Sequence, residues 1–289
     1  MKSVIGVITA RMASTRLPGK VMKTLAGKSV FAHHVERMKS VHGLKKVCLA
    51  TSIDPKNKDL IREAEKLDCI WYAGPEEDIV ERHVKLCEQE NADAVIRVTC
   101  DCPLFNIDIS SEFVRLFNTN YYDFISCGNM PMMQGTLTEL ISYKALMKVH
   151  ESYRGPAISL PIRENISAFS TTTMDIKSDL VRPEYRLTVD EPADYALMEH
   201  IYNELYEGYP IPLSKVYTWL DDNPEIAKIN LHVGIKGVNR YVANLMEKPL
   251  YSIVKSGEKY VILDEKKQII SAVQFLVNIK KMIELKDLI

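Results

Sequence analysis

Three cations lie close together near the N-terminus, in a turn-rich segment whose residue types could bind an anion. Residues 10–20 read ARMASTRLPGK and contain Arg11, Arg16 and Lys20. Like charges at this spacing repel one another unless an anion lies among them. Arginine forks and a lysine ammonium both suit phosphate oxygens. The segment therefore predicts a polyphosphate-binding loop, with solvated loop charges as the alternative; it does not match the G-x-x-x-x-G-K-[ST] pattern of a P-loop.

Two aspartates follow apolar runs that we expect to be strands. Asp101 lies in VTCDCPL (98–104), and Asp190 lies in LTVDEP (187–192). A carboxylate in such a position could bind Mg²⁺, which takes one or two protein carboxylates together with substrate phosphates. The alternatives are an Asx-turn for Asp101 and a helix N-cap for Asp190. Together with the cationic loop, the two acids predict metal-assisted nucleotidyl transfer.

The composition is that of a globular protein with an ample core. The chain has 289 residues, 46% of them hydrophobic and 26% charged, and its formal net charge is -1. The chain has no excess of basic residues that would indicate nucleic-acid binding, and no apolar run is long enough to span a membrane. The six cysteines form no C-x-x-C pair, and a strand begins almost at residue 1. We therefore expect reduced thiols, no signal peptide and a cytoplasmic location.

Apolar runs and amphipathic segments alternate along the first half of the chain. We expect strands at 3–9, 45–52, 69–72 and 93–99, and helices at 29–39, 55–67 and 76–90, the first of them capped by Ser29. This alternation predicts βαβ units and a mostly parallel, helix-covered sheet, an α/β fold. The loops that follow the first strand and the strand at 93–99 should meet at the edge where the strands end.

The second half is less regular. We expect strands at 121–127 and 170–176, then a strand at 185–190 that leads into a helix, and another helix and turn within 213–230. After residue 246 the pattern predicts a hairpin, with a glycine turn near 257, and a final helix at 271–287. The predicted organisation is a domain at 1–245 and a small C-terminal α+β extension at 246–289.

Four segments together resemble one known family. They are ARMASTRLPGK (10–20), AGPEEDIVERH (73–83), RVTCDCPL (97–104) and RLTVDEPADY (186–195). In this order they resemble the CMP-Kdo synthetase and acylneuraminate cytidylyltransferase superfamily, in particular the branch of the spore coat polysaccharide biosynthesis protein F. The resemblance covers about residues 1–230. It implies a Rossmann-like nucleotide-diphospho-sugar-transferase fold and the Mg²⁺-dependent reaction of CTP with a sugar, sugar acid or related small acceptor, which releases pyrophosphate.

The resemblance also implies roles for individual residues. The nucleotide would be bound by Ala10, Arg11, Ser14, Arg16, Lys20, Gly74, Asp78, Arg82 and Thr99. Asp101 and Asp190 would hold Mg²⁺, and Arg11, Lys20 and Asp101 would be catalytic. The acceptor would be bound by Gly135, Glu139 and Arg163. The resemblance further implies a homodimer, synthesis of cell-surface polysaccharide precursors, and no nucleic-acid or membrane partner.

The sequence departs from the branch mainly on the acceptor side. The branch has Thr-Gly-Asp where this chain has Cys100 between Thr99 and Asp101. Its Asp-Gly-Leu-Asp-x-Glu segment is reduced here to the glycine and the glutamate of residues 134–139, and Arg-Glu-His is replaced by residues 154–157, RGPA. These changes predict a usual nucleotide site with an unusual acceptor, or a weakened activity. A guanylyl- or other nucleotidyltransferase and a non-catalytic nucleotide-binding subunit are the alternative functions.

Overall fold

A computed structural model gives the arrangement of the chain. It describes residues 2–127, 134–155, 157–176, 180–182 and 184–233, together with the backbone of residues 251–256 and 259–264. The chain divides into two compact units, Met1–Asn230 and Leu231–Ile289, which are described separately.

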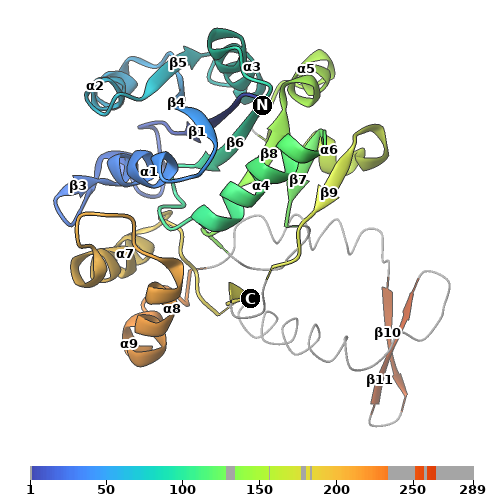
Figure 1. Cartoon of the computed structure of the whole chain (residues 1–289). Coiled ribbons are helices and arrows are strands. Elements are labelled where there is room, and N and C mark those ends of the chain that lie inside the picture. Colours follow the sequence, from blue (N-terminus) through green and yellow to red (C-terminus); the bar gives the residue numbers. More distant parts are fainter. Residues whose placement is uncertain are drawn as a thin grey trace. The chain divides into compact units, whose positions relative to one another are not determined.

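A seven-stranded sheet forms the centre of the first unit, in the order β5-β4-β1-β6-β8-β7-β9 (Figure 1). Its strands are β1 (Val4–Thr9), β4 (Leu44–Ser52), β5 (Ile70–Gly74), β6 (Ala94–Thr99), β7 (Phe124–Ser126), β8 (Glu139–Ser142) and β9 (Thr171–Thr173). The first four in spatial order are parallel, β8 is antiparallel to both β6 and β7, and β9 is parallel to β7. The predicted mostly parallel sheet is confirmed. A short separate hairpin joins β2 (Thr24–Leu25) and β3 (Lys28–Ser29).

Helices cover both faces of the sheet. They are α1 (Val30–Lys39), α2 (Lys58–Lys66), α3 (Ile79–Glu90), α4 (Ile107–Thr119), α5 (Tyr143–Ser152), α6 (Leu160–Glu164), α7 (Pro192–Leu205), α8 (Leu213–Asp222) and α9 (Pro224–Ala227). Alternate residues of β1 enter opposite cores: Ile8 lies with Phe31 of α1, and Val7 lies with Val84 of α3. Because side chains alternate along a strand, the continuous apolar run of β1 shows that both faces are buried.

Polar side chains determine where the helices begin. The Ser29 side chain accepts a hydrogen bond from the backbone N–H of Ala32, as predicted for an N-cap. The helix predicted at 76–90 begins later, at Ile79, because Asp78 is its N-cap and accepts from the backbone N–H of Glu81. The helix predicted at 55–67 opens with a 3₁₀ turn at Pro55–Asn57 before α2.

The strand predicted at 185–190 is wrong. The alternation of Leu187 and Val189, both fully buried, is typical of a strand, but these residues join no sheet. Their backbone N–H groups donate instead to single loop carbonyls, Leu187 to Gln134 and Val189 to Asp101. The segment therefore crosses over two loops, and its apolar side chains reach the core without a strand partner.

The second unit contains β10 (Tyr251–Ser256) and β11 (Lys259–Asp264), which pair antiparallel from Tyr251 opposite Asp264 to Ser256 opposite Lys259. The two strands of the predicted hairpin are confirmed. The turn near 257 and the helix predicted at 271–287 lie outside the described residues, and the domain boundary at 245 stays a prediction. None of the helices described in either unit has the length and apolar character needed to cross a bilayer.

Candidate active site

The loops after β1 and β6 meet at one edge of the sheet, as their topology predicts. β1 and β6 are neighbours, with Thr9 opposite Thr99, so both strands end at the same level. Lys20 Nζ lies 3.4 Å from Asp101 Oδ2 and 2.8 Å from Asp190 Oδ1. One ammonium group therefore joins two carboxylates that are far apart in the sequence. We call Lys20, Asp101 and Asp190 the lysine–aspartate cluster.

Hydrogen bonds within the N-terminal loop bring Lys20 to this place. The carbonyl of Met12 accepts from the backbone N–H groups of both Ser14 and Gly19, which folds the loop back on itself. Ser14 Oγ accepts from the N–H of Leu17 at 3.3 Å. Gly19 has a positive φ of 67°, which favours glycine. Lys20 follows at the start of a short 3₁₀ turn, with its side chain only 13% exposed.

Asp190 is held by its own backbone neighbourhood. The N–H of Val189 donates to the carbonyl of Asp101 at 2.7 Å, which fixes the segment beside the loop after β6. The fully buried Asp194 carboxylate accepts from the backbone N–H groups of Asp190 and Glu191. Glu191, not Asp190, is the N-cap of α7, so the N-cap alternative for Asp190 is wrong. The Asp190 side chain is thereby left to face the cations.

The other two cations of the loop lie in different surroundings. Arg16 Nη2 lies 3.2 Å from Asp190 Oδ1, and its Nη1 lies 3.5 Å from Glu191 Oε1. Arg16 thus extends the lysine–aspartate cluster. Arg11 is about half exposed and pairs with Glu76, in the loop after β5. The three cations do not surround a single point in this structure, and only Arg16 and Lys20 share a partner.

The pKa values in the lysine–aspartate cluster show that the attraction between opposite charges outweighs the effect of burial. Burial alone would lower the pKa of Lys20, but Asp101 and Asp190 outweigh it and raise that pKa above its usual value. Burial alone would raise the pKa of Asp101, but Lys20 and a hydrogen bond from Thr99 lower it below its usual range. The Lys20 ammonium and the Asp101 carboxylate are therefore both charged at neutral pH, because each stabilises the charged form of the other.

Gly74, Asp78 and Arg82 gather around the start of α3. A Cβ on Gly74 would lie 2.8 Å from Arg82 Cγ, so this arginine packs where only glycine leaves room. Arg82 is buried and donates to the backbone carbonyls of Glu76 and Asp78. These contacts connect the group to Arg11 through Glu76. The Asp78 carboxylate faces α5 instead, with Arg154 Nε at 3.0 Å and His150 Nε2 at 3.4 Å.

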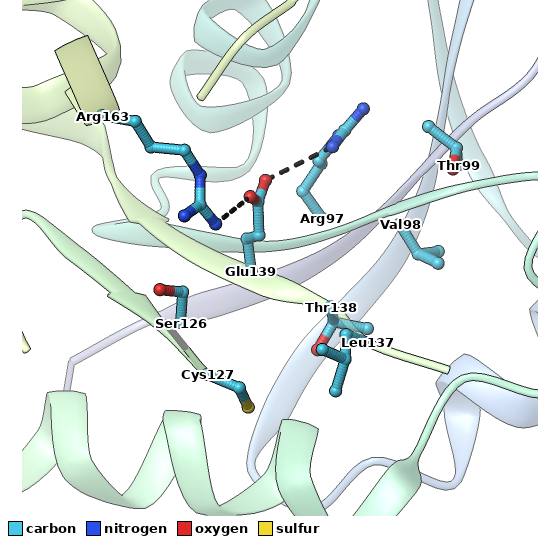
Figure 2. Close-up of a pocket in the computed structure, with 9 residues that line it drawn as sticks. All are labelled: Arg97, Val98, Thr99, Ser126, Cys127, Leu137, Thr138, Glu139 and Arg163. Atoms are coloured by element: carbon cyan, nitrogen blue, oxygen red, sulfur yellow. Dashed lines mark hydrogen bonds and ion pairs between the residues drawn. The ribbon is translucent and has the colours of Figure 1, made fainter. Parts of the chain in front are cut away.

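The predicted acceptor residues separate into two places. Glu139 and Arg163 form an ion pair of 2.9 Å that lines a pocket beside Thr99 (Figure 2). Gly135 does not line this pocket: its φ is 87°, and a Cβ would lie 1.9 Å from the carbonyl oxygen of Leu187. Packing therefore requires a glycine at position 135, because only a residue without a side chain lets this turn lie directly on the segment that leads to Asp190. Ala10 is buried, and its N–H donates to the Ala50 carbonyl.

Comparison with known proteins settles the family. A sequence profile of the cytidylyltransferase family matches residues 5–209. The chain belongs to the cytidylyltransferase family. It is 26% identical to the spore coat polysaccharide biosynthesis protein SpsF of Bacillus subtilis over 237 residues, which are 78% of this chain and 98% of that protein. An uncharacterized protein of Methanocaldococcus jannaschii is 27% identical over 80% of this chain and 95% of its own length.

A solved cytidylyltransferase from Leptospira borgpetersenii has the same fold as this cytidylyltransferase. Its structure matches with a TM-score of 0.73 and 24% identity, over 78% of this chain and 97% of that chain. The resemblance to the family and to the spore coat branch is confirmed, and the protein is a nucleotidyltransferase that uses CTP. The two relatives match over nearly their whole length, and these matches cover about four fifths of this chain.

The residues of the lysine–aspartate cluster fit a divalent cation. Mg²⁺ prefers oxygen ligands and keeps a few carboxylates beside substrate phosphates. Asp101 and Asp190 offer two carboxylates that both contact one ammonium group, and two carboxylates are the protein ligands that this cation takes. A second group, Asp78, Glu81 and His150, has ligand atoms within 4.8 Å of one another. Asp78 there is the N-cap of α3 and pairs with Arg154, and we assign no metal to this group.

Three residues of this site were not predicted from the sequence. Arg186 donates to Asp194 at 2.8 Å and lies 3.4 Å from Asp190, so it fixes the segment that carries the second aspartate. Arg97 lies 3.3 Å from Glu139 in the pocket of Figure 2. Arg97 could have been found, because it interrupts the apolar run VIRVT of a buried strand. The capping box at the start of α7 could have been predicted from the sequence, because Glu191 is followed three residues later by Asp194.

Proposed function

We propose that this cytidylyltransferase transfers CMP from CTP to a sugar, a sugar acid or a related small acceptor, with Mg²⁺, and releases pyrophosphate. The observation that carries the proposal is the lysine–aspartate cluster, where Lys20 Nζ lies within 3.4 Å of Asp101 and 2.8 Å of Asp190. Two carboxylates suit the cation, and the lysine and nearby arginine suit the phosphates. The cluster lies at the carboxyl ends of parallel strands, where ligands bind in sheets of this kind.

Asp101 and Asp190 would hold the Mg²⁺ ion. When bound there, the ion would neutralise charge on the phosphates of the nucleotide. Lys20, which is protonated because the two aspartates raise its pKa, would donate hydrogen bonds to those phosphates. Arg16 and the exposed Arg11 would bind the outer phosphates with their planar guanidinium groups. Ser14, Gly74, Asp78, Arg82 and Thr99 stay predicted nucleotide-binding residues.

The bond changes follow from these positions. An oxygen of the acceptor attacks the α-phosphorus of CTP, a new P–O bond forms, and the bond to the β-phosphate oxygen breaks, so pyrophosphate leaves with its electron pair. Lys20 and Arg16 stabilise the negative charge that builds up on the leaving group. We name no general base, because an acceptor carboxylate, phosphate or ionised hydroxyl can attack without one.

The name of the SpsF relative supports a role in polysaccharide precursor synthesis, which we include in the proposal. The homodimer and the cytoplasmic location stay predictions from the resemblance.

Thermal unfolding with CTP, UTP, GTP and ATP, each with and without Mg²⁺, tests the proposal. A ligand present at 100 times its dissociation constant stabilises the folded state by about 2.7 kcal/mol, a shift that is easily measured. We expect a Mg²⁺-dependent rise in midpoint with CTP. A rise with a different nucleotide alone would replace the proposed substrate, and no rise with any nucleotide would refute nucleotide binding by the loop.

A further inference from the structure

Arg37 is a charged side chain that is almost completely buried. It lies on α1 with 2% of its surface exposed, and burial lowers its pKa only to about 10, so it stays charged at neutral pH. Among the described residues no carboxylate lies within ion-pair distance of it, and Asp108 acts on it from farther away. Its Nε donates to the carbonyl of Phe105, and its Nη1 donates to the carbonyl of Ile211 at 2.8 Å. An apolar side chain would avoid the cost of burying a charge, so these two hydrogen bonds distinguish Arg37 from a packing residue.

The first of the two carbonyls belongs to the loop that carries Asp101. This loop connects β6 to α4 and is built from two turns: the N–H of Cys102 donates to the carbonyl of Thr99, and the N–H of Phe105 donates to the carbonyl of Cys102. Phe105 is fully buried, and the guanidinium carbon of Arg37 lies 5.7 Å from the centre of its ring. Arg37 therefore holds the far end of the loop that begins with the metal-binding candidate.

A second buried side chain holds the middle of the same loop. The hydroxyl of Tyr202, on α7, donates to the carbonyl of Pro103 at 3.0 Å, and the tyrosine is 3% exposed. The helix that carries Tyr202 begins directly after Asp190 and Glu191. Two helices thus hold the loop after β6 by its backbone, α1 through Arg37 and α7 through Tyr202. One of them is the helix that follows the second aspartate of the lysine–aspartate cluster.

The place of the Asp101 carboxylate depends on this loop. Mg²⁺ tolerates little departure from octahedral geometry, so the affinity of a site depends on how firmly its protein ligands are held. Side chains that orient the ligands of a metal without touching it commonly affect metal affinity as well. Arg37 and Tyr202 have the contacts expected of such residues, because each hydrogen-bonds a carbonyl within four residues of Asp101.

We propose that Arg37 and Tyr202 are positioning residues that hold the carboxylate of Asp101 where it can bind Mg²⁺. They act through the two loop carbonyls that they bind, and they do not themselves contact the metal ion. This inference rests on the proposed function, because that function places the metal at Asp101.

The experiment measures the binding of Mn²⁺ to the whole protein in the presence of CTP, by electron paramagnetic resonance, under conditions where urea unfolding shows each variant to be folded. We expect Arg37→Met to weaken Mn²⁺ binding about tenfold or more. By charge alone, the loss of a cation would strengthen the binding of a metal ion. The direction of the change therefore separates positioning from electrostatics. Arg37→Lys keeps the charge but not the fork that reaches two carbonyls, so it should restore only part of the affinity.

Tyr202→Phe removes a single hydroxyl and keeps the ring, so it provides the test if Arg37→Met does not fold. We expect it to weaken Mn²⁺ binding about two- to tenfold, as the loss of one hydrogen bond would. The control is Leu146→Ala, which opens a cavity at a fully buried residue of α5, in the core on the other face of the sheet. It should lower the urea midpoint and leave the Mn²⁺ affinity unchanged.

The failures are distinguishable. If the wild type with CTP does not bind Mn²⁺, the metal site of the proposed function is wrong, and this inference falls with it. If the wild type binds Mn²⁺ and Arg37→Met or Tyr202→Phe binds it as tightly, that residue only stabilises the fold and its positioning role is refuted. Stronger binding in Arg37→Met would assign the effect to charge. An equal loss of affinity in Leu146→Ala would assign it to general stability, and either result would overturn the inference.

Discussion

Replacing Lys20 with methionine removes the cation of the lysine–aspartate cluster while keeping a side chain of similar length. In the wild type, burial favours the neutral form of Asp101, and the charge of Lys20 is the main interaction that holds the pKa of Asp101 below its usual range. Without Lys20, burial dominates. We therefore expect the pKa of Asp101 to rise in Lys20→Met, to above its usual value.

The distance sets the size of this effect. Two unit charges 3.4 Å apart interact by ~5 kcal/mol at an effective dielectric constant of about 20. The Asp101 side chain is 25% exposed, so solvent screens part of this energy. The remaining interaction is still several times the thermal energy, so we expect a clear rise of the Asp101 pKa when Lys20 is removed. The titration of the Asp101 carboxyl carbon by ¹³C NMR measures it directly.

Stability should depend on pH in opposite ways in the two proteins. A carboxylate with a lowered pKa stabilises the wild-type fold at neutral pH, and this contribution is lost as the pH falls through its folded-state pKa. In Lys20→Met the raised pKa makes Asp101 destabilising at neutral pH and relieves that cost on acidification. The difference in free energy of unfolding between the two proteins should therefore be largest near pH 7 and shrink toward pH 4.

A matched control is Lys66→Met, which removes an exposed lysine, 74% accessible, that pairs with Glu63 on α2. It should leave the Asp101 titration unchanged. An Asp101 pKa that is the same in Lys20→Met and in the wild type would refute the electrostatic reasoning.

Three further changes have defined outcomes. Asp101→Ala should abolish CTP-dependent pyrophosphate release with a circular dichroism spectrum like that of the wild type; a fully active variant would remove Asp101 from the chemistry. Gly135→Ala should lower the urea midpoint strongly, because its Cβ would lie 1.9 Å from the Leu187 carbonyl oxygen at a φ of 87°; an unchanged midpoint would contradict this. Asp194→Ala should destabilise the fold by ~3–5 kcal/mol, since it leaves Arg186 without its buried partner; a loss below ~1 kcal/mol in urea unfolding would contradict it.

The sequence predicted the parts of the fold that depend on local pattern. The apolar run of β1 and the Ser29 cap of α1 are signals within a few residues, and both are confirmed. The meeting of the loops after β1 and β6 followed from parallel topology, and the distance of 3.4 Å between Lys20 and Asp101 confirms it. The rule that parallel strands end at one edge of the sheet was sufficient for this inference.

Non-local contacts account for what the sequence did not predict. Alternation at Leu187 and Val189 indicated a strand, but their backbone partners are loop carbonyls, both more than 50 residues away in the sequence, and no local pattern shows this. Likewise, Arg11 was grouped with Arg16 and Lys20 by spacing. In the structure it pairs with Glu76, since the side chains of an irregular loop need not point in one direction. The nucleotide and acceptor roles of the predicted residues stay predictions.

Metal binding to the lysine–aspartate cluster is the most direct test of the account. The binding of Mn²⁺, as a paramagnetic stand-in for Mg²⁺, can be measured by electron paramagnetic resonance in the presence of CTP. We expect Asp101→Asn and Asp190→Asn each to weaken Mn²⁺ binding about tenfold or more. Asp59→Asn, at an exposed aspartate of α2 that pairs with Arg62, should leave it unchanged. Wild-type Mn²⁺ affinity in both cluster variants would contradict the central claim that these two carboxylates hold the metal for CTP.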